Sequence, residues 1–394
     1  MEYKKCNQSK RDDYFEISYN FAVKNIKNKN NVKKRDIINR IRRLRKISMD
    51  KSIPPPFPNG WYAIEESKNV AVGQAISVSC LGEQFVVFRS TTNMQIFVLD
   101  AYCPHMGANL GIGGVVIGEK IQCPFHHWSF NGTNGECSNI PYSSCKPKSI
   151  KIKKWVAKEC NDYIFVWYSK EDCENLQWDL PIIDEIESKR FVYHGRNEFL
   201  VNCHIQDIPE NGADLAHFSA IHGDSLIAGN QPQFKWSACL GHHNWNAIWL
   251  PETETKHLSK IFLQHSMRLF GKIDICSMDV SGNQIGPAFV VLHINTAFGS
   301  IIITQVVTPI EPLTQKVVHR FYGSRLSAPF MKFLIFAESV MFERDMNIWN
   351  HKTFVNSPCL VKEDRLIKSY RNWFGQFYSS NSKTFKEAYE SSEW

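Results

Sequence analysis

Two short motifs, Cys103-Pro104-His105 and Cys123-Pro124-Phe125-His126, lie seventeen residues apart and decide how the rest of this chain is interpreted. Together they offer two thiolates and two imidazoles, which can bind a metal. Zinc sites usually take paired cysteines and paired histidines, whereas here each motif supplies one sulfur and one nitrogen. That division favours a two-iron cluster, in which one iron binds both thiolates and the other both imidazoles; tetrahedral zinc is the alternative. The predicted ligands of the [2Fe-2S] cluster are Cys103, His105, Cys123 and His126.

The composition is that of a globular protein with more than one core. The chain has 394 residues, of which 43% are hydrophobic and 13% aromatic, and this length favours two domains and a tail. Twelve cysteines are scattered along it without an apolar signal segment at the start, so we expect free thiols in a reducing compartment. We find no run of about 18 uncharged apolar residues and therefore expect no transmembrane helix.

The basic character of the chain is confined to its first fifty residues. These hold 15 Lys and Arg against 6 Asp and Glu, a balance of +9, which leaves −2 for the rest of the +7 chain. Such a segment can bind an anionic membrane surface or form a solvated, flexible or partly helical extension. Charge alone also permits nucleic-acid binding, but no motif supports it. We expect a flexible basic tail over residues 1–53 and no nucleic-acid partner.

Residues 54–172 predict an antiparallel β domain that carries the cluster motifs. A proline-rich stretch at 54–58 marks its start. Short runs rich in Val, Ile, Phe and Thr then alternate with turn residues, as expected of strands. The predicted strands lie within residues 75–81, 84–90, 95–103, 115–123, 148–155 and 163–169. Both cluster motifs directly follow such runs, so we expect the ligand loops at strand ends.

A connector at residues 173–184 precedes a second predicted domain, residues 185–394. Its centre is again rich in strand-forming residues, and helical segments flank it near residues 209–222 and 328–350. The predicted strands lie within residues 234–240, 246–250, 288–294, 299–307 and 317–323. We expect a large antiparallel sheet with helices packed on one side. The predicted fold class is therefore α+β, with an all-β domain followed by an α+β domain.

A second group of metal-binding side chains is predicted around His217 and His222. Five residues at 3.6 per turn span about 140° around an ideal helix, so His222 must lie where a helix bends or ends, and Gly223 fits a helix stop. A 2-His-1-carboxylate site needs one acid, and Asp345 is the candidate because helical spacing places it among apolar neighbours. Glu338 is the rival ligand. Taken alone, a histidine pair at this spacing is also compatible with ordinary core or surface positions.

Both groups of residues resemble the motifs of Rieske-type non-haem iron oxygenases. CPHMGANLGIGG (103–114) and CPFHHWSFNGTNGEC (123–137) resemble the Rieske segment, although His127 stands where that family usually has glycine. Residues 211–222 are similar to the family's N-x-x-D-x-x-H-x4-H motif, and ERDMNIW (343–349) is similar to its carboxylate-bearing helix. The resemblance implies that mononuclear Fe(II) is bound by three ligands, namely His217, His222 and Asp345. It also implies that Asp214 passes electrons between subunits of a head-to-tail homotrimer.

The resemblance implies a redox partner as well. The cluster accepts electrons from a reductase fed by NAD(P)H and passes them to the mononuclear iron, where O2 reacts with a C–H bond of the substrate. No dinucleotide-binding G-x-G-x-x-G follows a predicted strand in this chain. The reductase is therefore expected to be a separate protein.

A narrower resemblance, over about residues 54–380, is to the cholesterol 7-desaturase branch, the Neverland-type enzymes. PPPFPNGWY, DAYCPHMGANLGIGG, ENGADLAHFSAIH and ERDMNIWNHK carry it. It implies a helix-grip catalytic domain and the 7,8-dehydrogenation of cholesterol to 7-dehydrocholesterol in steroid hormone synthesis. It also implies association with the cytoplasmic face of a sterol-bearing membrane such as the endoplasmic reticulum. Members commonly carry an N-terminal membrane segment, whereas this chain has a basic polar tail there.

Two alternative functions compete with sterol desaturation. A related Rieske enzyme, such as the 3-ketosteroid 9α-hydroxylases, would hydroxylate another steroid position or remove a side chain. A non-enzymatic electron carrier would lack mononuclear iron, but it would need only the first β domain and leave about 200 residues unexplained.

Overall fold

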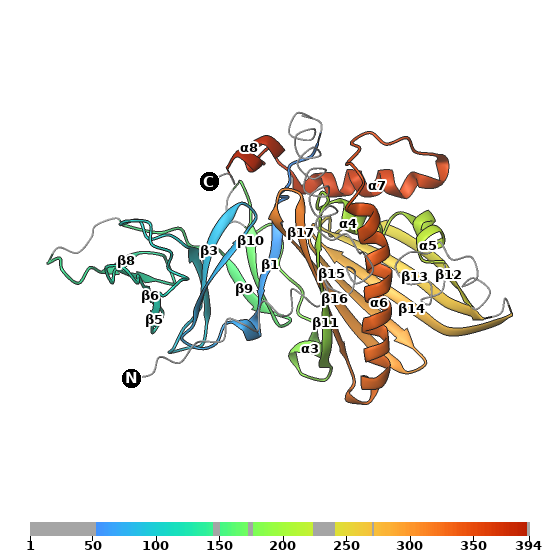
Figure 1. The fold of residues 1–394 in the computed structure, drawn as a ribbon, viewed down its shortest axis with the longest axis horizontal. Helices are drawn as coiled ribbons and strands as arrows, with labels where there is room; N and C mark the ends of the chain where they lie inside the picture. The colour runs from blue at the N-terminus through green and yellow to red at the C-terminus, as the bar shows by residue number, and fades with distance from the viewer. Residues whose placement is uncertain (1–52, 145–149, 172–175, 224–240, 270–271, 392–394) are drawn as a thin grey trace, which may run out of the picture. The chain divides into compact units, whose positions relative to one another are not determined.

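A computed structural model describes residues 53–144, 150–171, 176–223, 241–269 and 272–391. The basic tail and the predicted strand at 234–240 lie outside these described residues. Figure 1 shows how the elements follow one another from blue to red. Residues 52–394 form one compact unit, so the predicted domain boundaries at 172 and 185 stay predictions.

The first part of the described chain is antiparallel β structure, as predicted. Its ten strands form three sheets, in the orders β1-β10-β9, β2-β3-β4 and β5-β6-β7-β8. The strands are β1 (Gly60–Glu66), β2 (Ala75–Cys80), β3 (Glu83–Arg89), β4 (Ile96–Asp100), β5 (Val115–Ile117), β6 (Lys120–Gln122), β7 (Ser129–Asn131), β8 (Cys137–Asn139), β9 (Ala157–Cys160) and β10 (Tyr163–Tyr168). The strand predicted at 148–155 is wrong over its described part, where Lys151 and Lys154 form only isolated bridges.

Two tight turns fix the register of this part. Leu81 and Gly82 join β2 to β3, and Asn161 and Asp162 join β9 to β10; all four residues have positive φ. Two-residue loops with this backbone match the right-handed twist of a hairpin. Leucine is unusual in this conformation, and its side chain is fully buried.

The second part is one seven-stranded antiparallel sheet in the order β11-β17-β16-β15-β14-β13-β12. Its strands are β11 (Val192–Val201), β12 (Gly241–Pro251), β13 (Leu258–Leu269), β14 (Ile273–Ile285), β15 (Phe289–Thr296), β16 (Gly299–Glu311) and β17 (Thr314–Gly323). The predicted α+β class is confirmed. Strands β11, β13 and β14 were not predicted, because they carry polar and charged residues within the strand and so offer no continuous apolar run.

The described residues also form six α-helices. They are α3 (Asp184–Glu187), α4 (Asp207–Glu210), α5 (Leu215–Ile221), α6 (Ala328–Trp349), α7 (Arg365–Phe374) and α8 (Phe385–Glu390). Short 3-10 helices are η1 (Ser67–Asn69), η4 (Arg325–Ser327), η5 (Lys362–Asp364) and η6 (Gly375–Phe377). The predicted helix at 209–222 is therefore two helices. The long helix α6 contacts β11 and β17 (Figure 1).

Strand β16 is buried on both faces, which explains its continuous apolar sequence. Ile301 and Ile303 pack against Met331 of α6, whereas Ile302 belongs to the core that also contains Trp61 of β1. The side of the sheet away from α6 is therefore covered by the first β part at this strand. Among the described residues, no helix is long and apolar enough to cross a membrane.

Candidate functional site

The two cluster motifs lie on matching loops, as predicted. The first loop follows β4 and the second follows β6. Each is closed by the same backbone bond: the N–H of Cys103 donates to the carbonyl of Ala108 (2.9 Å), and the N–H of Cys123 donates to that of Trp128 (2.7 Å). The strands therefore hold two equivalent turns at one end of the small sheets.

In both loops the cysteine lies deeper in the protein than the histidine. Both cysteine side chains are buried, while the rings of His105 and His126 are half-buried, with centroids 4.6 Å apart. Nδ1 of His126 is buried without a hydrogen-bond partner. Burial raises the pKa of the Cys103 thiol to about 11, and the nearby Cys123 thiol adds to the effect. A metal replaces such a thiol proton, and the orphaned nitrogen suits a ligand. The four residues therefore fit a Rieske-type cluster.

Trp128 and Tyr142 together support the first loop, and this pair was not predicted. The indole of Trp128 stacks on His105, with centroids 4.6 Å apart and an interplanar angle of 8°. Its Nε1 donates to the hydroxyl of Tyr142 at 2.8 Å. The sequence carries no signal that joins Tyr142 to the motif, because this contact comes from the pairing of short strands. Between the ligand and the indole, His127 has a φ of 60°.

The predicted second site forms at the two ends of α5. Asp214 is the N-cap residue, and its carboxylate accepts from the N–H of His217 at 3.3 Å. The same residue's backbone carbonyl accepts from Nδ1 of His217, which leaves Nε2 of that ring available to a metal. His222 is the C-cap residue, with a φ of −104°. The helix therefore ends where the spacing of the two histidines predicted.

The structure brings Asp345 of α6 to both histidines. Ligand atoms of His217, His222 and Asp345 all lie within 4.8 Å of one another, and all three residues are buried. Nε2 of His222 donates to Oδ2 of Asp345 at 3.1 Å. Oδ1 of Asp345 is buried without a hydrogen-bond partner. Such an orphaned carboxylate oxygen beside two imidazoles fits a divalent metal.

The electrostatics of this group suit metal binding. Burial lowers the pKa of His217, and the facing Asp345 carboxylate opposes that shift. A neutral imidazole is the form that binds metal. Three ligands on one side of an ion leave positions open for O2 and substrate.

The rival ligand Glu338 lies elsewhere. Its carboxylate contacts Nδ1 of His319 and Nδ2 of Asn197, two turns before Asp345 on α6. The structure therefore brings Asp345 to the histidine pair.

Two further residues at this site were missed by the sequence analysis. Nε1 of Trp245 donates to the carbonyl of His222 at 3.1 Å. A guanidinium nitrogen of Arg344 donates to the carbonyl of Ile221 at 3.2 Å. An arginine beside the predicted ligand Asp345 in an apolar helix is the one sequence signal that could have drawn attention to the second contact.

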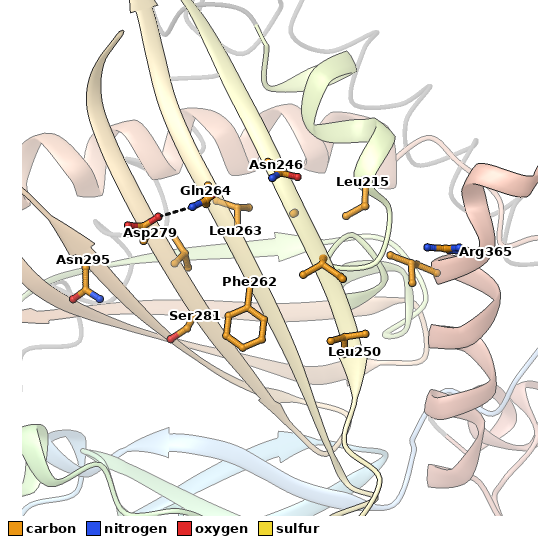
Figure 2. A pocket seen from close by; sticks show the side chains of 14 residues that line it. Leu215, Asn246, Leu250, Phe262, Leu263, Gln264, Asp279, Ser281, Asn295 and Arg365 are labelled. Carbon is orange, nitrogen blue, oxygen red and sulfur yellow. Dashed lines mark hydrogen bonds between the residues drawn. The ribbon is translucent and has the colours of Figure 1, made fainter.

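A pocket of about 640 Å³ is lined mainly by residues of β12, β13 and β14 (Figure 2). Asn246 of β12 is one of the lining residues, and it directly follows Trp245, whose ring contacts His222. Apolar side chains line much of it, including Leu215, Leu250 and Phe262. Two polar lining residues are hydrogen-bonded to each other, because Gln264 donates to Asp279 at 3.2 Å.

Two family models match the chain. Residues 60–156 match the Rieske [2Fe-2S] domain, and residues 166–378 match the C-terminal domain of 3-ketosteroid 9alpha-hydroxylase.

Curated relatives match along most of their length. A cholesterol 7-desaturase of Drosophila melanogaster is 55% identical over 90% of this chain and 82% of its own. One of Xenopus laevis is 42% identical over 89% of this chain and 78% of its own. The oxygenase component of 3-ketosteroid-9-alpha-monooxygenase from Rhodococcus rhodochrous is 28% identical over 82% and 85%.

Solved structures share the fold. Dicamba monooxygenase bound to dicamba matches with a TM-score of 0.61 at 15% identity, over 81% of this chain and 97% of that one.

Proposed function

The chain belongs to the cholesterol 7-desaturase family of Rieske oxygenases, and from this premise we propose that it introduces a double bond between C7 and C8 of cholesterol. The observation that carries the proposal is the buried group His217, His222 and Asp345 downstream of paired Cys-His loops. An electron-carrier protein has no use for this second site. The product would be 7-dehydrocholesterol, used in steroid hormone synthesis.

We assign the roles by position. The four loop residues at 103, 105, 123 and 126 would hold the [2Fe-2S] cluster, within a domain spanning 54–172. The group on α5 and α6 would hold Fe(II), within a catalytic domain spanning 185–394 beyond the connector at 173–184. Iron held by this ligand set would supply the activation of O2. Neighbouring residues of the chain hold these three side chains in place, fix the tautomer of His217 and keep all three side chains buried.

The reaction balances with one O2 and two electrons. Cholesterol loses two hydrogens, NAD(P)H and one proton supply the other two, and O2 leaves as two water molecules. Since the sequence lacks a dinucleotide fingerprint, we propose a separate reductase as the partner that oxidises NAD(P)H.

We further propose a head-to-tail homotrimer in which Asp214 conducts electrons between subunits. Exposed apolar side chains flank the cluster ligands, with Met106 65% and Phe125 58% exposed. Leu215, which directly follows Asp214, is one of the residues that line the pocket of Figure 2. Apolar surface of this kind favours a protein contact, and these two surfaces would meet between copies.

The substrate also suggests a location. Cholesterol resides in membranes, and the basic segment at residues 1–50 has a charge balance of +9. Polybasic segments bind anionic lipid surfaces. We propose association with the cytoplasmic face of a membrane such as the endoplasmic reticulum.

Steroid hydroxylation is the second candidate, because the C-terminal match is to a hydroxylase family. Both outcomes begin with the removal of one hydrogen and differ in the second step of the reaction. Purified protein, iron, a surrogate reductase and NADH should be incubated with cholesterol and analysed by mass spectrometry. Desaturation gives loss of two hydrogens, whereas hydroxylation gives gain of one oxygen.

A variant tests the iron assignment in the same assay. His217→Ala should abolish product formation while the visible spectrum of the cluster stays intact. Persistent turnover in this variant would show that the triad is assigned wrongly.

A further inference from the structure

The last turn of α5 presents a structural problem at the ligand His222. The final carbonyls of a helix have no partners within it, and His222 lies at that end. A ligand at a frayed helix end would not be held in one position. The segment 221–223 therefore needs partners from other elements.

Three consecutive carbonyls find such partners. The carbonyl of Ile221 accepts from Arg344, and that of His222 accepts from the indole of Trp245. The carbonyl of Gly223 accepts from the backbone N–H of His243 at 2.8 Å. Helix α6 and strand β12 thus hold the backbone on both sides of the ligand.

The indole of Trp245 is itself fixed by its surroundings. It stacks on Phe218 of α5 with centroids 5.5 Å apart, and its other neighbour His265 lies at 4.3 Å. His265 is hydrogen-bonded to His243 across the two strands at 2.7 Å. The indole N–H is therefore directed at His222 by packing on several sides.

The Arg344 contact is coupled to the other ligand. Arg344 directly precedes Asp345 on α6, and its side chain is 2% exposed. One turn of α6 thus supplies the carboxylate that faces His222 and the guanidinium that holds the residue before it. A shift of α6 would move both together.

We propose that Trp245 and Arg344 are positioning residues for the mononuclear iron site, which fix His222 through its backbone. The inference rests on the proposed function, since it presumes that His222 binds iron. Neither residue touches the metal. Their effect is to keep the imidazole within reach of Asp345 and His217 before iron arrives.

The test is the Fe(II) affinity of the mononuclear site in Trp245→Phe. Loss of an outer partner of a metal ligand weakens binding by about 10- to 100-fold. Fe(II) would be titrated anaerobically into protein with an intact cluster, and the EPR signal of the nitric oxide complex would report occupancy and symmetry. We expect weaker binding and an altered line shape, with the cluster's own EPR signal unchanged.

Trp249→Phe is the matched control. Trp249 lies four residues along β12, is buried, and donates its indole N–H to Ser259 at 3.2 Å. This variant should bind Fe(II) with wild-type affinity. Equal affinity and line shape in Trp245→Phe and Trp249→Phe would overturn the proposal.

If Trp245→Phe fails to assemble its cluster, Arg344→Lys tests the positioning role instead. Lysine keeps the charge without the planar fork, so binding should weaken in the same way, and wild-type affinity would overturn the proposal. His217→Ala distinguishes a failure of the proposed iron triad from a failure of the positioning role. If it binds Fe(II) like the wild type, the triad itself is wrong, and the positioning role is overturned with it.

Discussion

His127 shows how one backbone angle constrains the cluster loop. It lies between the proposed cluster ligand His126 and Trp128, is exposed, and has a φ of 60°. Its N–H donates to the carbonyl of Cys123 at 3.1 Å, a bond that closes the turn. Glycine adopts it without strain, which explains why the resembled family usually has glycine here.

His127→Gly should therefore stabilise the protein. The left-handed conformation costs a side chain about 1 kcal/mol, and part of this is offset by the larger unfolded-state entropy of glycine. We expect a small gain in the free energy of unfolding, measured by urea denaturation. His127→Ala is the control, because it removes the imidazole and keeps the strain; an equal gain there would contradict the backbone explanation.

Asp214 has a structural role in addition to the one proposed in electron transfer. As N-cap of α5 it satisfies the N–H of His217. Asparagine caps a helix as well as aspartate does, whereas alanine costs about 1 kcal/mol.

Two variants of Asp214 should separate these roles. Asp214→Asn should keep the stability of the wild type, and Asp214→Ala should lose about 1 kcal/mol in thermal or urea unfolding. Both should slow electron arrival at the mononuclear iron, as followed by single-turnover oxidation of the cluster. Wild-type electron transfer in Asp214→Asn would leave only the capping role.

At the scale of elements, β12 and β13 place a buried imidazole pair close to the proposed iron ligand His222. His243 and His265 are hydrogen-bonded and both buried. Burial, with smaller contributions from the neighbouring imidazole of His265 and the guanidinium of Arg344, lowers the pKa of His243 to about 3. The folded protein thus keeps His243 neutral across the physiological range.

Because of His243, the free energy of unfolding should depend on pH in the acidic range. Between the ordinary histidine pKa of 6.5 and about 3, the unfolded chain binds a proton that the folded His243 does not. The free energy of unfolding should therefore fall as the pH drops through this window. Urea unfolding at several pH values should show a shallower fall in His243→Asn. Identical slopes in the two proteins would argue against this assignment.

At the scale of the molecule, a buried ion network joins the first β part to the large sheet. Arg320 of β17 is 3% exposed, and its guanidinium donates to the carbonyl of Asp162 at 2.8 Å. Glu66 of β1 lies 3.8 Å away and is also buried. The ring of Tyr193 contacts the same cation at 4.6 Å. Removing the cation would leave a carboxylate buried with fewer partners.

Arg320→Met should therefore lower the free energy of unfolding by about 3–5 kcal/mol, the usual effect of breaking a buried pair. Lys189→Met is the control, because Lys189 pairs with the same Asp162 at 3.1 Å but is 68% exposed. Its loss should cost less than about 1 kcal/mol. Urea unfolding measures both, and similar losses in the two variants would contradict a role for burial.

The sequence by itself determined which residues could be grouped as candidate ligands. Spacing within a loop is local, so Cys103, His105, Cys123 and His126 could be grouped before any fold was known. The end of α5 at His222 followed from helical geometry. Long apolar runs such as β16 were predicted because burial on both faces leaves a continuous pattern.

Only the tertiary structure decided which distant side chains meet. Asp345 and Glu338 share one helical stripe, and their sequence positions do not show which of them faces the histidines. Strands β13 and β14 were missed because one of their faces is open and carries polar residues. Trp245 reaches His222 through sheet register and helix packing, which depend on contacts between residues far apart in the chain.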